Sequence, residues 1–168
     1  MDEADAPGTQ PAPGARSAGS RHLREHVYGI DCWIDDPRAV DYDPWLHADR
    51  LGIPVIAREN LPTPQMVACY SARQGAIFIR PNLHGAVERC ALSHEIVHFE
   101  HRDIGTTRRQ EDRADRFAAR RLIRPSVIAA LAQETNDVGV WALELSVTER
   151  IMRAYLQVRR ELETAAAQ

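Results

Sequence analysis

Residues 90–99 read Cys-Ala-Leu-Ser-His-Glu-Ile-Val-His-Phe, and the interpretation of the whole chain starts from this stretch. Apart from His94, Glu95 and His98, almost every side chain in it is apolar, so we expect a helix in the centre of the protein. Two imidazoles and a carboxylate are costly to bury unless they are paired or bound to a metal ion. The stretch therefore predicts a central helix that carries a polar site.

The spacing of these three residues is typical of a zinc site. Residues i and i+4 lie on one face of a helix, so His94 and His98 aim their imidazoles at a common point. Zn²⁺ accepts imidazole ligands in a tetrahedral site, and the neighbouring Glu95 can take a proton from metal-bound water without binding the ion. A bare His-Glu-x-x-His also occurs by chance on solvated helix faces, so the interpretation depends on a third ligand.

A catalytic zinc site takes three protein ligands and keeps one position open. One known pattern continues with Gly and a further His, but this chain has His101 and Ile104 at those two positions, so that pattern fails. The other route takes a Glu from a second helix downstream. A helix is expected at 108–123, where two acids fall on the apolar face while arginines gather on the opposite face.

We interpret Glu111 as the third zinc ligand on that helix. Asp115, one turn further, would accept the second N–H of a ligand histidine, most simply that of His94. Three alternatives stay open. Glu111 could be an acid favoured by the helix dipole, Asp112 could be the ligand instead, and Asp115 could pair with a neighbouring arginine.

The remaining elements give an α+β order, with a small antiparallel sheet followed by a mainly helical part. Residues 1–20 are rich in Pro, Gly, Ala and Ser and are expected to be disordered. Asp43-Pro44 predicts a helix start, and Gly75 predicts the turn of a hairpin. The expected helices are 21–28, 44–51, 83–101, 108–123, 125–132, 137–145 and 147–163, and the expected strands are 53–57 (at an edge), 66–72 and 76–80.

Composition narrows the class of protein. The 168 residues carry a net charge of −3, so we expect no direct nucleic-acid binding, and the arginine-rich segment 108–124 is interpreted as a solvated face. No apolar run is long enough to cross a membrane and no secretory signal is visible, which predicts a cytoplasmic protein. Cys32, Cys69 and Cys90 are widely spaced and are expected to be buried thiols.

The chain resembles the ImmA/IrrE family of metallopeptidases over about residues 42–160. The resemblance rests on 94–98, on Glu-Asp-Arg-Ala-Asp-Arg-Phe-Ala-Ala at 111–119 and on Leu-Ile-Arg-Pro at 122–125. It implies a zincin-like fold and a gluzincin-like site, with His94, His98 and Glu111 on zinc and Glu95 as the catalytic carboxylate. One departure is Arg113, where many members have an acid; we expect it to change the surface around the site and not the ligand set.

The resemblance also implies a function and a division of the chain. Members occur in phages, integrative elements and bacterial stress regulators, and they cut helix-turn-helix repressors. A zinc endopeptidase that relieves repression inside a bacterial cell is therefore expected, with a repressor as its protein partner. The metallopeptidase core would span 21–133, and 134–168 would form a helical segment that resembles a helix-turn-helix and packs on the same domain.

A rival hypothesis is a non-catalytic, zinc-containing regulator that binds a repressor or DNA. An open zinc position beside Glu95 would distinguish the enzyme from this regulator. Other residues leave choices open as well. Tyr70 could stabilise an oxyanion or simply pack in its strand, His101 could touch the site or cap its helix, and the strand at 76–80 could offer an edge to an extended peptide.

Overall fold

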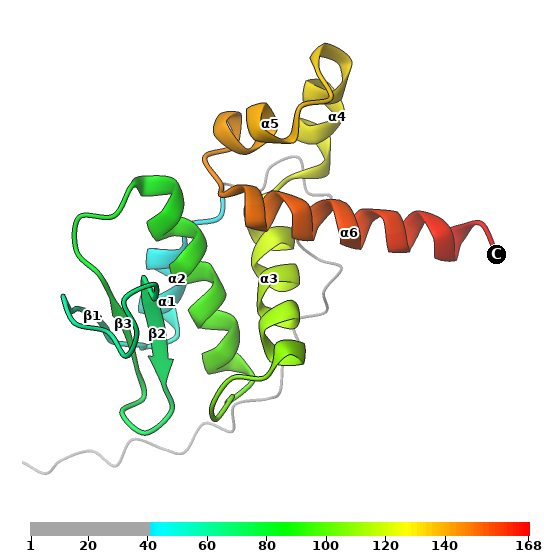
Figure 1. Ribbon diagram of the computed structural model, residues 1–168. Helices are drawn as coiled ribbons and strands as arrows, with labels where there is room; N and C mark the ends of the chain where they lie inside the picture. Colours follow the sequence, from blue (N-terminus) through cyan, green and yellow to red (C-terminus); the bar gives the residue numbers. More distant parts are fainter. Residues whose placement is uncertain (1–40) are drawn as a thin grey trace, which may run out of the picture.

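The computed structural model describes residues 41–168 (Figure 1). The predicted tail 1–20, the predicted helix 21–28 and Cys32 lie outside these residues. The predicted α+β order is confirmed, with a small sheet ahead of a series of helices. The elements are α1 (Pro44–Arg50), β1 (Val55–Ala57), β2 (Ala68–Ser71), β3 (Ala76–Ile79), α2 (Gly85–Glu100), α3 (Arg108–Leu122), α4 (Pro125–Glu134), α5 (Val138–Glu144) and α6 (Glu149–Ala166).

The sheet is mixed, whereas the sequence predicted an antiparallel one. β2 and β3 form the expected antiparallel hairpin, with Gly75 at φ 60° in its turn. β1 pairs with the other side of β3 and runs parallel to it, which gives the strand order β1-β3-β2. The loop 58–67 reverses the chain and the hairpin reverses it again, so β3 returns in the direction of β1. Local sequence signals do not encode this long-range pairing.

The strand order also corrects the expected position of a free edge. β3 is central and hydrogen-bonded on both sides, and all four of its residues are buried. The hypothesis that 76–80 offers an edge to a peptide is therefore wrong. Among the described strands the free edges belong to β1, where an edge was expected, and to β2, which lies beside α2.

α2 lies between two apolar cores, and this position explains its nearly continuous apolar sequence. Leu92 and Ile96 are fully buried against the sheet side, while Cys90 packs with the helices that follow. Figure 1 shows α2 between the sheet and α3. The polar face of α2 therefore lies where the sheet side of the protein meets the helices that follow α2.

α3 runs beside α2 and under α6 (Figure 1). It begins with a capping box in which Thr107 and Gln110 bond to each other's backbone N–H groups. Ala114 and Ala118 are fully buried, and their small side chains let the neighbouring helices approach closely. This packing brings both α3 and the first turn of α6 next to the polar face of α2.

The C-terminal helices share a core with α3. Trp141 of α5 and Ile151, Met152 and Tyr155 of α6 belong to the same apolar cluster as Ala118. The boundary near residue 133 and the likeness of 134–168 to a helix-turn-helix stay predictions. Within residues 41–168, no helix combines the length and the apolar character needed to cross a membrane.

Candidate metal centre

The two histidines of α2 converge, because they lie one turn apart on the face that points to α3. Nε2 of His94 and Nε2 of His98 are 3.0 Å apart, and both side chains are buried. Without a proton on either Nε2, both nitrogen lone pairs would be directed into the same small volume. Such a pair is the expected arrangement of two metal ligands on one helix.

Glu111 of α3 closes the group from the other side. Its Oε2 lies 3.3 Å from Nε2 of His94, and its Oε1 lies 3.3 Å from Nε2 of His98. One ligand atom from each of the three residues can be chosen so that all lie within 4.8 Å of one another. The rival residue Asp112 is 66% exposed and lies 4.0 Å from Arg108, on the outer face of α3. The structure therefore brings Glu111, and not Asp112, to the imidazoles.

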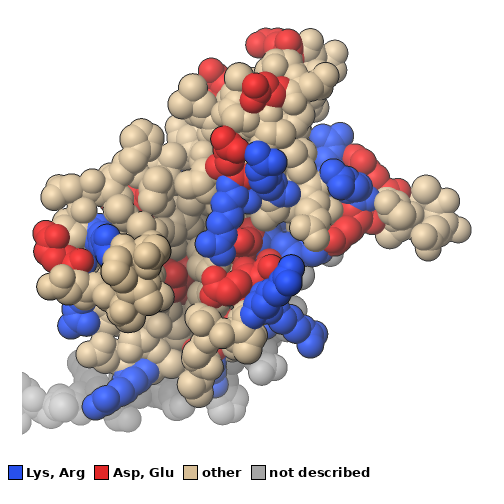
Figure 2. Space-filling model, viewed as in Figure 1, with Lys and Arg blue, Asp and Glu red and all other residues tan. Residues whose placement is uncertain are grey.

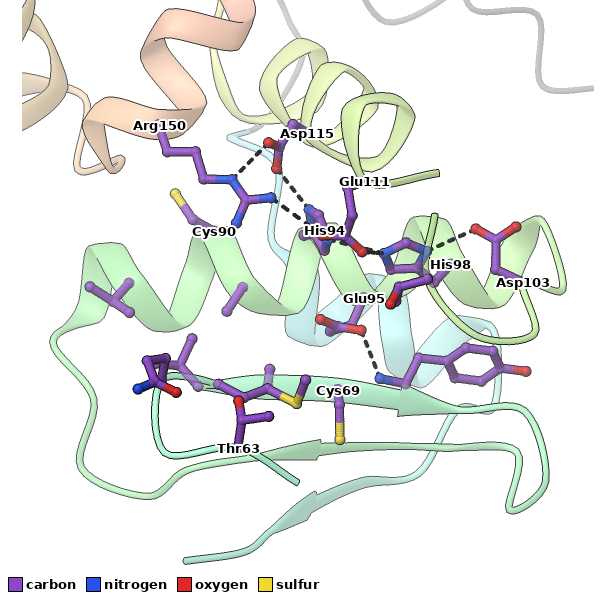
Figure 3. A pocket seen from close by; sticks show the side chains of 18 of the residues that line it. Thr63, Cys69, Cys90, His94, Glu95, His98, Asp103, Glu111, Asp115 and Arg150 are labelled. Carbon is purple, nitrogen blue, oxygen red and sulfur yellow. Dashed lines mark hydrogen bonds and ion pairs between the residues drawn. The ribbon is translucent and has the colours of Figure 1, made fainter. Parts of the chain in front are cut away.

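The second nitrogen of each imidazole is held by a carboxylate (Figure 3). Nδ1 of His94 lies 2.9 Å from Oδ1 of Asp115, and Nδ1 of His98 lies 2.8 Å from Oδ2 of Asp103. A carboxylate on Nδ1 fixes that nitrogen as the N–H donor, so Nε2 is the free ligand atom. Both rings are thus oriented for coordination through Nε2.

Asp103 was missed by the sequence analysis. It lies in the loop between α2 and α3, where no helical or strand periodicity marks one residue above another. Its carboxylate also accepts bonds from Gln110 at 3.0 Å and from Nη2 of Arg113, which is 2.6 Å from both oxygens. Arg113, which was expected to change the surface around the site and not the ligand set, also holds the carboxylate that holds His98.

The pKa values of His94, Glu111 and Asp103 are shifted by their mutual contacts and by burial. Burial opposes protonation of His94, but hydrogen bonds to Asp115 and Glu111 outweigh it and raise the pKa of His94 to about 9. The hydrogen bond with His94 lowers the pKa of Glu111 to about 2. Burial would raise the pKa of Asp103, but the hydrogen bonds from Arg113, His98 and Gln110 lower it to about 2. Glu111 and Asp103 are therefore ionised at neutral pH in the metal-free site.

Glu95 points from α2 toward the sheet. Its Oε2 accepts the backbone N–H of Tyr70 in β2 at 2.7 Å. Burial raises the pKa of Glu95, which brings this carboxyl group closer to the neutral range where a proton acceptor is effective. The ring of Tyr70 packs edge-on against the ring of Phe99, with 5.7 Å between the ring centroids. His101 hydrogen-bonds through Nδ1 to the backbone carbonyl of Val97 at the end of α2.

An open cleft gives access to these groups. Its volume is about 530 Å³, and it is lined by β2 and the preceding loop, by α2 and α3, and by the start of α6. Figure 2 shows acidic side chains gathered in the hollow at the centre of this face, with basic side chains along its flank. Glu95, Glu111, Asp115 and both histidines line this cleft, so a molecule that enters it reaches the whole group.

The residues present fit a zinc ion. Three carboxylates contact the imidazoles (Asp103, Glu111 and Asp115) and two guanidinium groups contact these carboxylates (Arg113 and Arg150), so once His94 has lost its proton a divalent cation would enter a negatively charged environment. Two imidazole nitrogens and one carboxylate oxygen are a donor set that zinc accepts. Cys69 and Cys90 line the cleft but lie outside this donor set, and Sγ of Cys90 accepts the N–H of Thr148 at 3.3 Å.

A buried helix with two convergent imidazoles and an adjacent acid, completed by a carboxylate from a second helix beside an open cleft, defines a metallopeptidase-type centre. The profile of the IrrE N-terminal-like domain matches residues 48–160, and the chain therefore belongs to this family, the ImmA/IrrE metallopeptidases. No curated protein and no solved structure matches the chain.

Proposed function

We propose that the protein is a zinc-dependent endopeptidase in which His94, His98 and Glu111 hold the ion and Glu95 is the general base. The observation that carries the proposal is the convergence of two imidazole Nε2 atoms and one carboxylate in a cleft that Glu95 also faces. Asp115 has a supporting role, because its contact with Nδ1 of His94 keeps the other nitrogen free to coordinate.

A zinc ion bound there would acidify a water molecule and polarise the scissile carbonyl group. The chain's own groups handle the proton. One oxygen of Glu95 is fixed by the N–H of Tyr70, which leaves Oε1 as the oxygen that takes the proton from water. The same carboxyl group can then pass this proton to the leaving amine.

The edge of β2 supports an extended polypeptide as the substrate. The N–H of Tyr70 points away from β3, since it bonds to Glu95. Backbone groups alternate along a strand, so the N–H of Ala68 faces the same side, and both residues line the cleft. A peptide that pairs with this edge would lie across the imidazoles with one of its bonds next to Glu95.

We further propose that the substrate is a helix-turn-helix repressor, and that cleavage relieves repression in the cytoplasm of a bacterial host carrying a phage or mobile element. The support is membership of the ImmA/IrrE metallopeptidases together with the resemblance drawn from the sequence motifs. Pairing with β2 requires an extended substrate segment, so the cleaved bond is expected in a linker or terminal segment of the repressor, outside its helices.

The test is incubation of the zinc-loaded protein with the repressor encoded beside it. Glu95→Gln keeps an acceptor for the N–H of Tyr70 but cannot take a proton, so cleavage should slow by about 10²–10⁴-fold while zinc content and melting temperature are kept. Glu88→Gln is the matched control, because Glu88 lies on the same helix and contacts Trp45 at the surface. Cleavage by Glu95→Gln at the wild-type rate would overturn the proposed function, as would a wild-type protein that yields no defined product.

A further inference from the structure

Arg150 adds a positive charge to the cleft, although it lies far from His94 and His98 in the sequence. It lies in the first turn of α6, and among the cleft-lining residues within 41–168 it is the one lysine or arginine. Its Nε donates to Oδ2 of Asp115 at 2.7 Å, and its Nη2 lies 3.4 Å from Oε2 of Glu111. The guanidinium group is therefore next to the imidazole-and-carboxylate group, although it comes from a different helix.

The contact with Asp115 orients this guanidinium group without using all of its donors. Arg150 is 61% exposed at its side chain, and Nη1 has no acceptor among the residues that the structure describes. An arginine fork has five N–H donors in a fixed plane, so anchoring through Nε leaves the other edge to face the cleft. The group is held in place and remains able to bind a ligand oxygen.

Arg150 and Glu95 lie on opposite sides of the imidazole pair. Glu95 is tied to β2 through the N–H of Tyr70, while Arg150 is tied to α3 through Asp115. Figure 3 shows the two side chains on either side of His94. A carbonyl group placed over the imidazoles would therefore have a proton acceptor on one side and a hydrogen-bond donor on the other.

We propose that Arg150 is a catalytic residue that donates hydrogen bonds to the scissile carbonyl oxygen as this oxygen becomes an oxyanion. The inference rests on the proposed peptidase function and adds the group that meets the developing negative charge. As the water oxygen bonds to the carbonyl carbon, its proton moves to Glu95 and the carbonyl π electrons move onto the oxygen facing Arg150. When the C–N bond breaks, these electrons re-form the carbonyl group and the nitrogen takes the proton from Glu95.

Two other candidates near the imidazoles, Tyr70 and Arg113, have partners of their own. The ring of Tyr70, which the sequence left as an option for this role, packs against Phe99. Arg113 is bound to both oxygens of Asp103. Arg150 thus combines a fixed position with free N–H groups, the two properties that a preorganised oxyanion donor requires.

The test compares Arg150→Gln and Arg150→Lys with Arg153→Gln, a control on the same helix whose arginine pairs with Glu149 at the surface. Loss of one oxyanion donor is expected to lower kcat by about 10²–10³-fold with little change in KM. Arg150→Lys should keep part of the activity, because it retains the charge but loses the planar fork. Arg153→Gln should cleave the repressor at the wild-type rate.

A second measurement separates this role from a structural one. A peptide phosphinate carries tetrahedral, anionic oxygens like those of the intermediate, and its affinity should fall in Arg150→Gln by the same factor as kcat. The affinity for zinc should stay at the wild-type value. Equal phosphinate affinity in wild type and variant, or a loss of activity that is fully restored by excess zinc, overturns the inference.

Failure of the inference and failure of the proposed function give different results. If the wild-type protein cleaves the repressor and Arg150→Gln cleaves it equally well, only the role of Arg150 is overturned. If the wild-type protein neither cleaves the repressor nor binds the phosphinate, both are overturned.

Discussion

Replacing Asp103 by alanine should weaken zinc binding although no proposed ligand is removed. The Asp103 carboxylate is 7% exposed and lies 2.8 Å from Nδ1 of His98, so little water can replace it. Loss of such a partner of a ligand histidine lowers metal affinity by about 10–100-fold, and we expect the upper half of that range here because of the burial. The loss of binding free energy for this upper half is about 2.0–2.7 kcal/mol.

The same substitution also affects the fold. Arg113 loses both of its oxygen partners but is 31% exposed, so water can solvate it partly. The free energy of unfolding should therefore fall by less than the roughly 3–5 kcal/mol typical of breaking a fully buried ion pair. Adding Arg113→Met removes the unpaired charge, and this double variant should regain stability without regaining zinc affinity.

The assay is a competition titration of zinc against a chromophoric chelator. Asp112→Ala is the matched control, because Asp112 is 66% exposed and pairs with Arg108 at 4.0 Å on the outer face of α3. Its zinc affinity should equal that of the wild type. If Asp103→Ala also binds zinc as tightly as the wild type, the reasoning that Asp103 orients His98 is refuted.

Two further predictions concern protonation and packing. The pKa of His94 is about 9 in the metal-free protein, above its ordinary value of 6.5, so His94 is protonated there at neutral pH and must lose its proton to bind zinc. A dye assay in weak buffer near pH 7.5 should show about one proton released per zinc ion, and less above pH 9; no release at neutral pH would contradict the shift. Ile96→Ala removes a fully buried side chain next to the sheet and should lower the free energy of unfolding by about 2–5 kcal/mol in denaturant titrations. Ile56 lies in the edge strand β1 and is 43% exposed, so Ile56→Ala should lower the free energy of unfolding much less. Equal losses would show that α2 is not the centre of the core.

Local signals carry much of the fold. Asp43 caps α1 through its side chain, Pro125 begins α4, and Gly75 provides the positive φ of the hairpin. Each of these features depends on a few adjacent residues, so the sequence predicts it well. The parallel pairing of Val55 in β1 with Ile77 in β3 depends on contacts across more than twenty residues, and no local signal specifies it.

The residues of the site also differ in how well local sequence signals predict them. Helical periodicity places Glu111 and Asp115 on the apolar face of α3, and the structure turns that face toward His94. Asp103 lies in a loop, and Arg150 comes from a helix that meets α3 only in the folded chain. The sequence predicts side chains on regular elements, but it does not predict which loop or distant helix completes their hydrogen bonds.

The central claim is that two imidazoles of α2 and one carboxylate of α3 hold a single ion. Anomalous diffraction at the zinc absorption edge, from crystals of the zinc-loaded protein, tests it most directly. The account predicts one peak in coordination contact with Nε2 of His94, Nε2 of His98 and the carboxylate of Glu111, about 2.0–2.2 Å from each. A peak at a cysteine sulfur, or one that leaves Glu111 uncoordinated, would contradict it.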